Sequence, residues 1–394
     1  PVLATVLWVV IAVTAGGVYP AVVQRFIVQP NVSTRELPFI DRNIAATKEA
    51  LGLADISRSV LNPQPITAAN LNDDPSPLQN VRQLDPIQMR DRFILDEGRT
   101  SFYAVRDLDV DRYEIEGRTQ QVMVAARELN SEGIPNRTWV SRHLLYTHGC
   151  GLIAAPASRT TTDGRPVYVD LGVTRPELYF GEGIDSYAVV GTEQVEQPCV
   201  GEPTKQTTPG GVQLSSVLRR AAYAIQYSEY NLFGSGLINS QSFIIHDRNV
   251  TDRVNRLAPF LRYDSDPYPA VVDGTVQWIL DAYTISDRYP YAQEANTDQL
   301  SPGGGLNASF NYVRNSVKAV VDAFTGDVTF YVIDPNDPIT AAWSKAFPKL
   351  FTDVSQAPAE LVKHFRYPED LFRVQTNVYG RYQFDDSTLF FNRD

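Results

Sequence analysis

Metal-binding and redox-active side chains are scarce in this sequence of 394 residues, which contains two cysteines, two methionines and four histidines. The Cys and His spacings of structural zinc sites do not occur. The sequence also lacks a P-loop, a dinucleotide-binding glycine fingerprint, a GxSxG nucleophile elbow and an HExxH helix. We therefore expect no cofactor, and no residue is assigned a catalytic role.

Clusters of basic residues are also missing. Lys and Arg number 35 against 46 Asp and Glu, which gives a net charge of −11 at pH 7. Proteins that bind nucleic acids neutralise the phosphates with grouped Lys and Arg side chains. An acidic chain without such a group is expected to have no nucleic-acid partner.

The first 24 residues carry no charged side chain, and Arg25 is the first charged residue. About 20 apolar residues let an α-helix cross the hydrocarbon core of a bilayer, and Trp8 and Tyr19 are of the types that settle near lipid headgroups. We predict a transmembrane helix over residues 1–24, with the lipid bilayer as its partner. A signal peptide would begin with Met and a basic region, and a buried core helix would be shorter and flanked by polar positions. Because the chain starts at Pro1 inside an apolar run, we expect this span to be truncated and further spans to precede it.

The remaining chain, residues 25–394, has the composition of a folded protein, since 43% of all residues are hydrophobic. Alternating apolar residues predict strands between residues 100 and 128. The dipeptide Asp273-Gly274 between two apolar runs predicts a hairpin, and a second hairpin is predicted with Thr325-Gly326-Asp327 at its tip.

Apolar periodicity predicts helices over residues 37–53, 212–233, 249–261, 339–351 and 357–382. Extended or irregular segments are predicted over residues 23–31, 55–86 and 204–211. The expected fold class is α+β, with mixed antiparallel sheets and packed helices behind one N-terminal transmembrane helix. The length of the region 25–394 suits one large or two modest domains, and we expect subdomains over about residues 30–205 and 206–394.

The two cysteines lie beside turn-forming residues, Cys150 in THGCG and Cys199 in EQPCV. Such loops suit a disulfide, which would indicate an oxidising compartment. Two unrelated reduced thiols are the other interpretation, and the residues alone do not decide between them.

Three aspartates alternate with apolar residues in DLDVD, at Asp107, Asp109 and Asp111. One interpretation is a calcium-like site, because hard cations bind several carboxylate oxygens. However, Arg112 and Arg118 stand where an EF-hand loop needs Gly and Glu. The alternation favours a strand with its acidic face in water, and the three aspartates are kept as weak metal candidates.

Histidines and paired carboxylates offer the remaining routes to catalysis. His143 and His148 are five residues apart and do not share a helix face, so His148 is expected to be a hydrogen-bonded residue at a helix end. The spacing of His246 and His364 does not suggest a shared metal. Two carboxylate pairs could act as acid and base on a glycosidic bond: Glu177 with Glu182, and Asp264 with Asp266.

Many separate motifs in one order resemble the uncharacterised protein family 0182 of bacterial multi-spanning membrane proteins. The resemblance rests on YPAVVQRFIVQPN, DRNIAATKEALGL, NVRQLDP, DLDVDRYEIEG, AARELN, HLLYTHGCG, ELYFGEG, DPYPAVVDGTVQWILDAYTISDRYPY, NYVRNSVKAVVDAFTGDVTFYV and RYPEDLF. It implies several N-terminal spans, a large extracytoplasmic domain and a further tail, of which this chain resembles the last span and most of the domain. It brings no catalytic residue.

The resemblance also affects the cysteines and the orientation. Cys150 and Cys199 both depart from the family pattern, and two cysteines that arise together in an extracytoplasmic domain imply a disulfide between them. Four basic residues after the span would favour a cytoplasmic body by the positive-inside rule, namely Arg25, Arg35, Arg42 and Lys48. The resemblance instead implies that the body faces outward from a multi-pass protein of the cell membrane.

We therefore expect the extracytoplasmic domain of an integral membrane protein that acts by binding or assembly in the cell envelope rather than by catalysis. A homo-oligomer and a lipid or glycan ligand are the expected partners. The alternatives are the substrate-handling part of a membrane transporter and an envelope hydrolase that uses a carboxylate pair.

Overall fold

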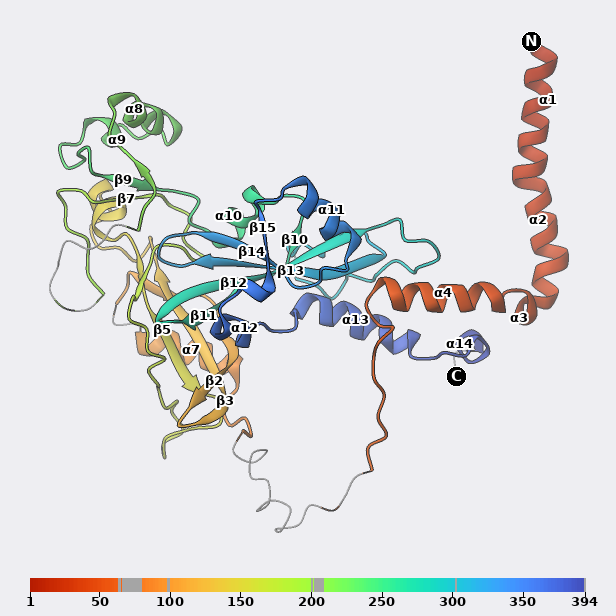
Figure 1. Ribbon diagram of the computed structural model, residues 1–394, viewed down its shortest axis with the longest axis horizontal. Helices are drawn as coiled ribbons and strands as arrows, with labels where there is room; N and C mark the ends of the chain where they lie inside the picture. The colour runs from red at the N-terminus through yellow and green to blue at the C-terminus, as the bar shows by residue number, and fades with distance from the viewer. Residues whose placement is uncertain are drawn as a thin grey trace. The chain divides into compact units, whose positions relative to one another are not determined.

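The computed structural model describes residues 1–62, 65, 80–97, 100–199, 201, 209–301 and 303–392 (Figure 1). The chain packs into two compact units, which are described separately. The first unit holds Pro1–Ser59, Thr284–Arg314 and Glu369–Asp394, and the second holds Val60–Tyr283 and Asn315–Pro368. The subdomain division expected near residue 205 stays a prediction.

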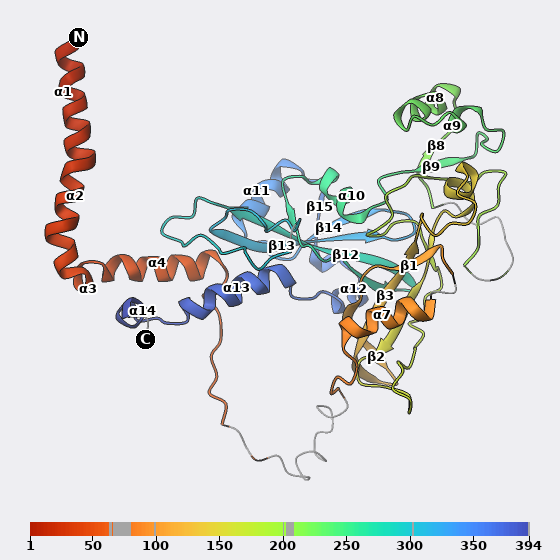
Figure 2. The same ribbon diagram turned by 180° about the vertical axis from the view of Figure 1, so that it is seen from behind.

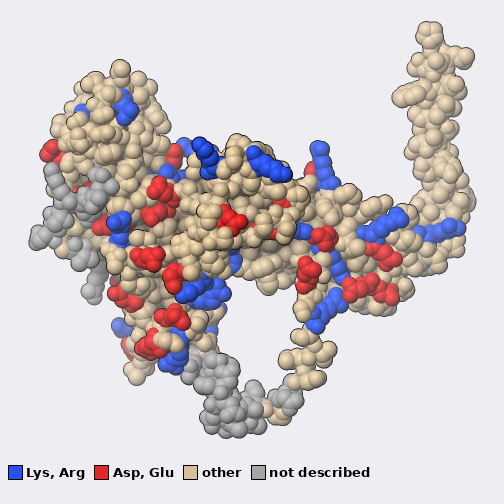
Figure 3. Space-filling view, in the orientation of Figure 1, with Lys and Arg blue, Asp and Glu red and all other residues tan. Residues whose placement is uncertain are grey.

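The first unit begins with an apolar helix of 30 residues, Val2–Asn31, which is not buried by the rest of the protein. At about 1.5 Å per residue this helix is about 45 Å long. By length and composition it is the one helix of the described chain that could cross a membrane. Its outer turns carry no charged atoms (Figure 3). Its successive segments are α1 (Val2–Val13), a π-turn (Thr14–Val18), α2 (Tyr19–Val23), a second π-turn (Gln24–Val28) and a 3-10 turn (Gln29–Asn31).

The extended exit segment predicted over residues 23–31 is wrong, because the chain stays helical to Asn31. Gln and Arg are good helix formers, so the polar residues Gln24 and Arg25 do not end the helix. Pro20 stands at the start of α2, after the wider π-turn, where its missing N–H breaks less of the hydrogen-bond ladder than in a helix interior.

Four helices complete the description of the first unit: α3 (Val32–Arg35), α4 (Leu37–Ala50), α13 (Glu369–Tyr382) and α14 (Ser387–Asn392). The helix predicted over residues 37–53 is thereby confirmed. The chain turns after the long helix, and α4 runs beside α13 (Figures 1 and 2). Hydrogen bonds fix α4 at Asn43, whose side chain donates to the carbonyl of Tyr291 (2.8 Å) and accepts from the hydroxyl of Tyr382 (2.8 Å).

The second unit contains two larger sheets. In the first sheet β3 (Arg118–Leu129) pairs antiparallel with each of its three neighbours, β1 (Tyr103–Val105), β2 (Asp109–Ile115) and β5 (Leu152–Pro156). Helix α7 (Pro86–Glu97), which the periodicity did not predict, packs Phe93 and Met89 against this sheet. The strands expected between residues 100 and 128 are confirmed.

The second sheet has the order β10-β12-β13-β14-β15, with β11 also paired to β12. Its strands are β10 (Arg262–Tyr263), β11 (Tyr268–Val272), β12 (Thr275–Ser286), β13 (Tyr312–Asp322), β14 (Val328–Val332) and β15 (Phe351–Asp353). Both predicted hairpins are present. At the first tip Asp273 and Gly274 have φ of 49° and 76°, which is the left-handed backbone of a type I′ turn. Strands β14 and β15 are parallel, and the other described pairs of this sheet are antiparallel.

Shorter strands and helices complete the described part of the second unit: β4 (Gly149–Cys150), β6 (Glu177–Leu178), β7 (Ala188–Val190), β8 (Val212–Gln213), β9 (Phe243–Ile245), α8 (Val217–Gln226), α9 (Asn231–Gly234), α10 (Val250–Leu257), α11 (Pro338–Ala346) and α12 (Ala359–Lys363). The helices predicted near 249–261 and 339–351 are confirmed as α10 and α11. The helix predicted over 212–233 is broken into α8 and α9, and Ser228 between them has a φ of 51°. The described parts of the irregular segment 55–86, up to residue 85, contain no helix or strand, and residues 204–208 of the predicted loop lie outside the described residues.

Candidate functional site

Strand β2 carries two buried aspartates on one face. Asp109 and Asp111 are two residues apart, so both side chains leave the strand on the same side, and their exposed fractions are 6% and 3%. Asp107 lies before the strand and is exposed, and its carboxylate accepts a hydrogen bond from the backbone N–H of Leu108 (2.7 Å). The expected acidic face in water is therefore wrong for Asp109 and Asp111.

Both aspartates pair with basic side chains from the segment after α12. Nδ1 of His364 lies 2.7 Å from Oδ2 of Asp111, and Nη2 of Arg366 donates to Oδ1 of Asp109 at 2.7 Å. His364 and Arg366 are two residues apart, like the aspartates. The helix predicted over 357–382 is broken here, because Pro368 disfavours helical backbone at the residue before it. Because the helix is interrupted here, the side chains of His364 and Arg366 reach the aspartates of β2.

Arg366 is fixed by hydrogen bonds and by a contact with an aromatic ring. Its Nη1 donates to the carbonyl of Val110 (3.1 Å), and its guanidinium carbon lies 3.6 Å from the ring centroid of Tyr268. The backbone N–H of Arg366 donates to the Tyr268 hydroxyl (3.2 Å), and its carbonyl accepts from Nζ of Lys318 (2.6 Å). These contacts fix the segment that carries His364.

A second buried ion pair lies beside the first. Nζ of Lys318 donates to the carboxylate of Asp281, and their side chains are 2% and 4% exposed. Burial lowers the pKa of Lys318 and raises the pKa of Asp281, and the attraction between the two charges opposes both effects. Burial also raises the pKa of Asp109 to about 7, against the opposing charge of Arg366.

His364 lies in the wall of a cleft of about 600 Å³. The lining combines cations, carboxylates, one tyrosine ring and aliphatic side chains: Arg112, Tyr113, Glu114, Thr119, Leu171, Val271, Glu360, Val362, Lys363 and His364. Nδ1 of His364 is occupied by Asp111, and Nε2 has no hydrogen bond to any residue that the structure describes. The His364 side chain is 6% exposed, and Nε2 is the ring nitrogen that a ligand would bind.

An imidazole whose Nδ1–H is bound by a carboxylate has its tautomer and orientation set, and its other nitrogen can accept a proton or a hydrogen bond. Asp111 and His364 have this arrangement. The chemistry that the site supports is hydrogen bonding to a polar ligand, and proton abstraction from a hydroxyl or a water placed at Nε2.

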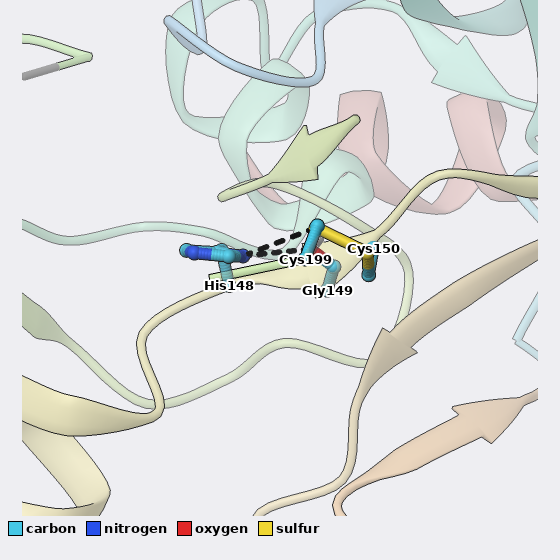
Figure 4. The surroundings of a disulfide bond; sticks show 4 residues. All are labelled: His148, Gly149, Cys150 and Cys199. Atoms are coloured by element: carbon cyan, nitrogen blue, oxygen red, sulfur yellow. Dashed lines mark hydrogen bonds between the residues drawn. A yellow bond between two sulfur atoms is a disulfide. The ribbon is translucent and has the colours of Figure 1, made fainter. Parts of the chain in front are cut away.

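The structure joins Cys150 and Cys199 by a disulfide with a Cα–Cα distance of 5.5 Å (Figure 4). This distance is within the usual range of about 4.4–6.8 Å. Sγ of Cys199 lies 3.9 Å from Nδ1 of His148 and 3.7 Å from the carbonyl oxygen of Gly149.

His148 is 2% exposed, and its Nδ1 bonds the carbonyl of Gly149 (2.8 Å). Its Nε2 is buried without a hydrogen-bond partner among the residues that the structure describes. Burial lowers the pKa of His148 to about 4, so the ring is neutral at pH 7. His143 bonds the carbonyl of Tyr187 (2.8 Å) and stacks on its ring, and burial lowers the pKa of His143. Neither histidine lines the cleft.

The carboxylate pairs considered for acid–base catalysis do not line the cleft either. Asp264 is buried, and its carboxylate accepts hydrogen bonds from the hydroxyl of Tyr283 and from the backbone N–H of Asp266. Glu177 lies in β6, and burial together with neighbouring carboxylates raises the pKa of Glu182 well above its ordinary value.

Within the described chain, no three His, Cys, Asp or Glu side chains form a group that could hold a metal ion. Of the three candidate aspartates, Asp109 and Asp111 are engaged by Arg366 and His364. The sequence patterns do not connect these four residues. The one available signal was that Asp-x-Asp and His-x-Arg have the same spacing.

The chain is an α+β protein with an N-terminal helix that is long and apolar enough to cross a membrane. Its α+β body carries a histidine–aspartate pair at a cleft. The chain belongs to the Uncharacterised protein family (UPF0182), whose sequence model matches residues 1–394.

Several members of this family are similar along the chain. A UPF0182 protein of Clavibacter sepedonicus is 40% identical over 416 residues, which cover 100% of this chain and 42% of that protein. UPF0182 proteins of Frankia alni and Streptomyces coelicolor are 40% and 39% identical, covering 100% and 99% of this chain and 42% of each relative. The chain thus spans about two fifths of the length of these relatives. No solved structure matches it.

Proposed function

We propose that the chain is an extracytoplasmic part of an integral membrane protein of the cell envelope, and that it binds an envelope carbohydrate in the cleft beside His364. The cleft is the observation that carries this proposal. Its volume of about 600 Å³ is in the range of sites for small ligands, about 300–1,000 Å³.

The lining suits a ligand rich in hydroxyl groups, since each hydroxyl both donates and accepts hydrogen bonds. Lys363 and Arg112 supply donors, and Glu360 and Glu114 supply acceptors. The ring of Tyr113 supplies the aromatic surface on which the apolar face of a sugar can lie.

Arg112 is held in place before a ligand arrives, whereas Lys363 and Glu360 form an exposed pair. Arg112 donates to the carbonyls of Lys363 (2.7 Å) and Phe365 (3.1 Å). Nζ of Lys363 lies 2.7 Å from the carboxylate of Glu360 on the same helix. A lining that is already ordered loses less entropy on binding.

The extracytoplasmic location is supported by the cysteines. Cys150 and Cys199 are the only cysteines of the chain, and they are joined. Disulfides persist in oxidising compartments and are rare in the cytosol.

Isothermal titration of the full chain in detergent tests carbohydrate binding, with an N-acetylated amino-sugar oligosaccharide and a neutral glucan of equal length as the probes. The double variant Glu360→Gln, Lys363→Met is expected to weaken binding at least tenfold. Lys345→Met, on α11 and outside the cleft lining, is the control and should bind as the unmodified chain does. Absence of binding by both oligosaccharides, or equal binding by the double variant, would refute the proposal.

A hydrolytic activity is the second candidate, and the Asp111–His364 pair favours it. Nε2 of His364 would take a proton from a water molecule, whose oxygen then attacks an ester or acetal carbon of the ligand, and the proton passes to the leaving oxygen. Chromogenic ester and glycoside substrates test this activity. His364→Gln should abolish turnover and Asp111→Asn should reduce kcat more than it changes KM, whereas a rate that is unchanged in His364→Gln would exclude the pair as the catalyst.

A further inference from the structure

We propose that the first unit holds an anionic phospholipid from the leaflet beside the long helix, in a pocket between α4, α13 and α14. This inference depends on the proposed entry of Val2–Asn31 into a bilayer, and it does not depend on the cleft at His364. The pocket has a volume of about 410 Å³ and is lined by Phe39, Ile40, Asn43, Arg381, Phe390 and Phe391.

The walls of the pocket are suited to an acyl chain. Phe39 and Phe391 are 52% and 38% exposed although they are large apolar side chains. Phe39 and Asn43 are four residues apart on α4 and share one face of the helix, with Ile40 beside them, whereas Asp41 points away from that face. An apolar surface of this kind is stabilised when hydrocarbon covers it.

Arg381 lines the pocket and supplies the complementary charge for a phosphate, and Arg42 lies next to the lining residue Phe39. The guanidinium of Arg381 lies 5.0 Å from the ring centroid of Phe390, and that of Arg42 lies 5.4 Å from the ring centroid of Phe39. Neither arginine has a carboxylate partner among the described residues. A guanidinium stacked on an aromatic ring keeps its N–H groups available for phosphate oxygens.

The acidic residues near α14 are engaged elsewhere. Asp385 pairs with Nζ of Lys48 (2.5 Å). The carboxylate of Asp386 accepts hydrogen bonds from the backbone N–H groups of Thr388 (2.7 Å) and Leu389 (3.1 Å) at the start of α14. Neither carboxylate is therefore paired with Arg381 among the described residues.

Chain continuity places the pocket close to the end of the long helix. Phe39 follows Asn31, the last residue of the long helix, by eight positions, and α3 and α4 are helical. At about 1.5 Å per helical residue this separation is about 12 Å along one axis. The headgroup region of a bilayer is roughly 5–8 Å deep on each side. Because α4 turns away from the axis of the long helix (Figures 1 and 2), it stays close to the level of Asn31, where we propose that the headgroups lie.

Native mass spectrometry of the full chain, released from nanodiscs of phosphatidylglycerol and phosphatidylcholine in equal amounts, tests the proposal. We expect retained phosphatidylglycerol, and a fall of about fivefold in its retention for Arg381→Gln, as follows from losing one Arg near an anionic surface. Arg373→Gln is the matched control, since Arg373 lies on the same helix, pairs with Glu369 and is not in the pocket lining. Inorganic phosphate at millimolar concentration should not displace the lipid, because it lacks the acyl chains.

Photo-crosslinking identifies the occupant of the pocket. A p-benzoylphenylalanine in place of Phe391 should yield a phospholipid adduct. A peptide adduct would show that a second copy or another part of the chain fills the pocket, and would overturn the proposal. Equal retention of both lipids, or an unchanged retention in Arg381→Gln, would also overturn it, and neither result would bear on carbohydrate binding at the cleft.

Discussion

Two buried ion pairs in the second unit, Lys318 with Asp281 and Arg366 with Asp109, tie together segments that are distant in the sequence. Lys318 joins β13 to β12 through Asp281 and joins β13 to the segment after α12 through the carbonyl of Arg366. Such pairs contribute little net stability compared with apolar residues of the same size, but removing one partner leaves an uncompensated buried charge. Their role here is to fix the position of the residues beside the cleft.

The Lys318→Met variant is therefore expected to lose about 3–5 kcal/mol of unfolding free energy, since the carboxylate of Asp281 stays buried without its partner. The double variant Lys318→Met, Asp281→Leu should recover most of this loss. Urea unfolding of the full chain in detergent, followed by tryptophan fluorescence, measures both. A double variant as unstable as the single one would show that packing, rather than the unpaired charge, determines the loss.

His148 gives the fold a dependence on pH. Its pKa is lowered to about 4 in the folded protein, against about 6.5 in an unfolded chain. As the pH falls below about 6.5, the unfolded state binds a proton that the folded state does not, so stability decreases until about pH 4. The loss approaches 1.4 kcal/mol per pH unit and totals about 3 kcal/mol.

Unfolding at pH 7 and pH 5 measures this effect as the difference between the unmodified chain and His148→Gln. The difference is needed because Asp109, whose pKa is raised to about 7, acts in the opposite direction: it contributes stability as the pH falls from about 7 toward 4. The variant should lose less stability between pH 7 and pH 5 than the unmodified chain does. Parallel pH profiles for the two proteins would contradict the assignment to His148.

Among the elements, the hairpin between β13 and β14 depends on a close approach at its tip. Gly326 has a φ of 73°, and a Cβ there would lie 2.3 Å from the ring of Phe180. Gly164 has a similar φ of 77°, but nothing lies within 4 Å of a Cβ at that position. Alanine substitutions at the two positions therefore distinguish the free-energy cost of the left-handed backbone from the cost of the clash with Phe180.

We expect Gly164→Ala to cost about 1 kcal/mol, which is the strain of a left-handed alanine. Gly326→Ala should cost about 2–4 kcal/mol, because Phe180 must also move within a packed core. Urea unfolding of both variants checks the order. Equal losses would show that Phe180 adapts without cost and that only the backbone requires glycine.

The elements that were predicted correctly have local signals. The hairpin at Asp273-Gly274 needs only the dipeptide and two apolar runs, and α4 needs only its own periodicity. The site has no local signal, because Asp111 and His364 are 253 residues apart in the sequence. Its position also depends on a break in the helix predicted over 357–382, which Pro368 explains in retrospect. The prediction that the acidic face of β2 is exposed to water is wrong for the same reason, because the alternation of apolar and acidic residues identifies a face of the strand but not the segment that covers it.

For the protein as a membrane component, two observations give opposite orientations. Basic residues follow the long apolar helix, as in cytoplasmic segments, whereas the joined cysteines favour an oxidising compartment. The lipid pocket offers another reason for part of the basic charge, because Arg42 lies on the aromatic ring of Phe39 at the proposed headgroup level. Large domains cross the membrane largely regardless of such charges, so the cysteines are the stronger guide.

The state of Cys150 and Cys199 in native membranes is therefore the most informative test of orientation. Alkylation before lysis, followed by mass mapping without reductant, should recover the two cysteines as one linked peptide pair. In the chain-entropy account, a disulfide that closes a loop of 49 residues raises the free energy of unfolding by about 4 kcal/mol. The double variant Cys150→Ser, Cys199→Ser should therefore lose a comparable free energy of unfolding, measured by urea denaturation. Two alkylated thiols in membranes would place the body in a reducing compartment. The basic residues would then have been the correct guide, and the proposed extracytoplasmic location would fall while the pocket beside the long helix would still face a leaflet.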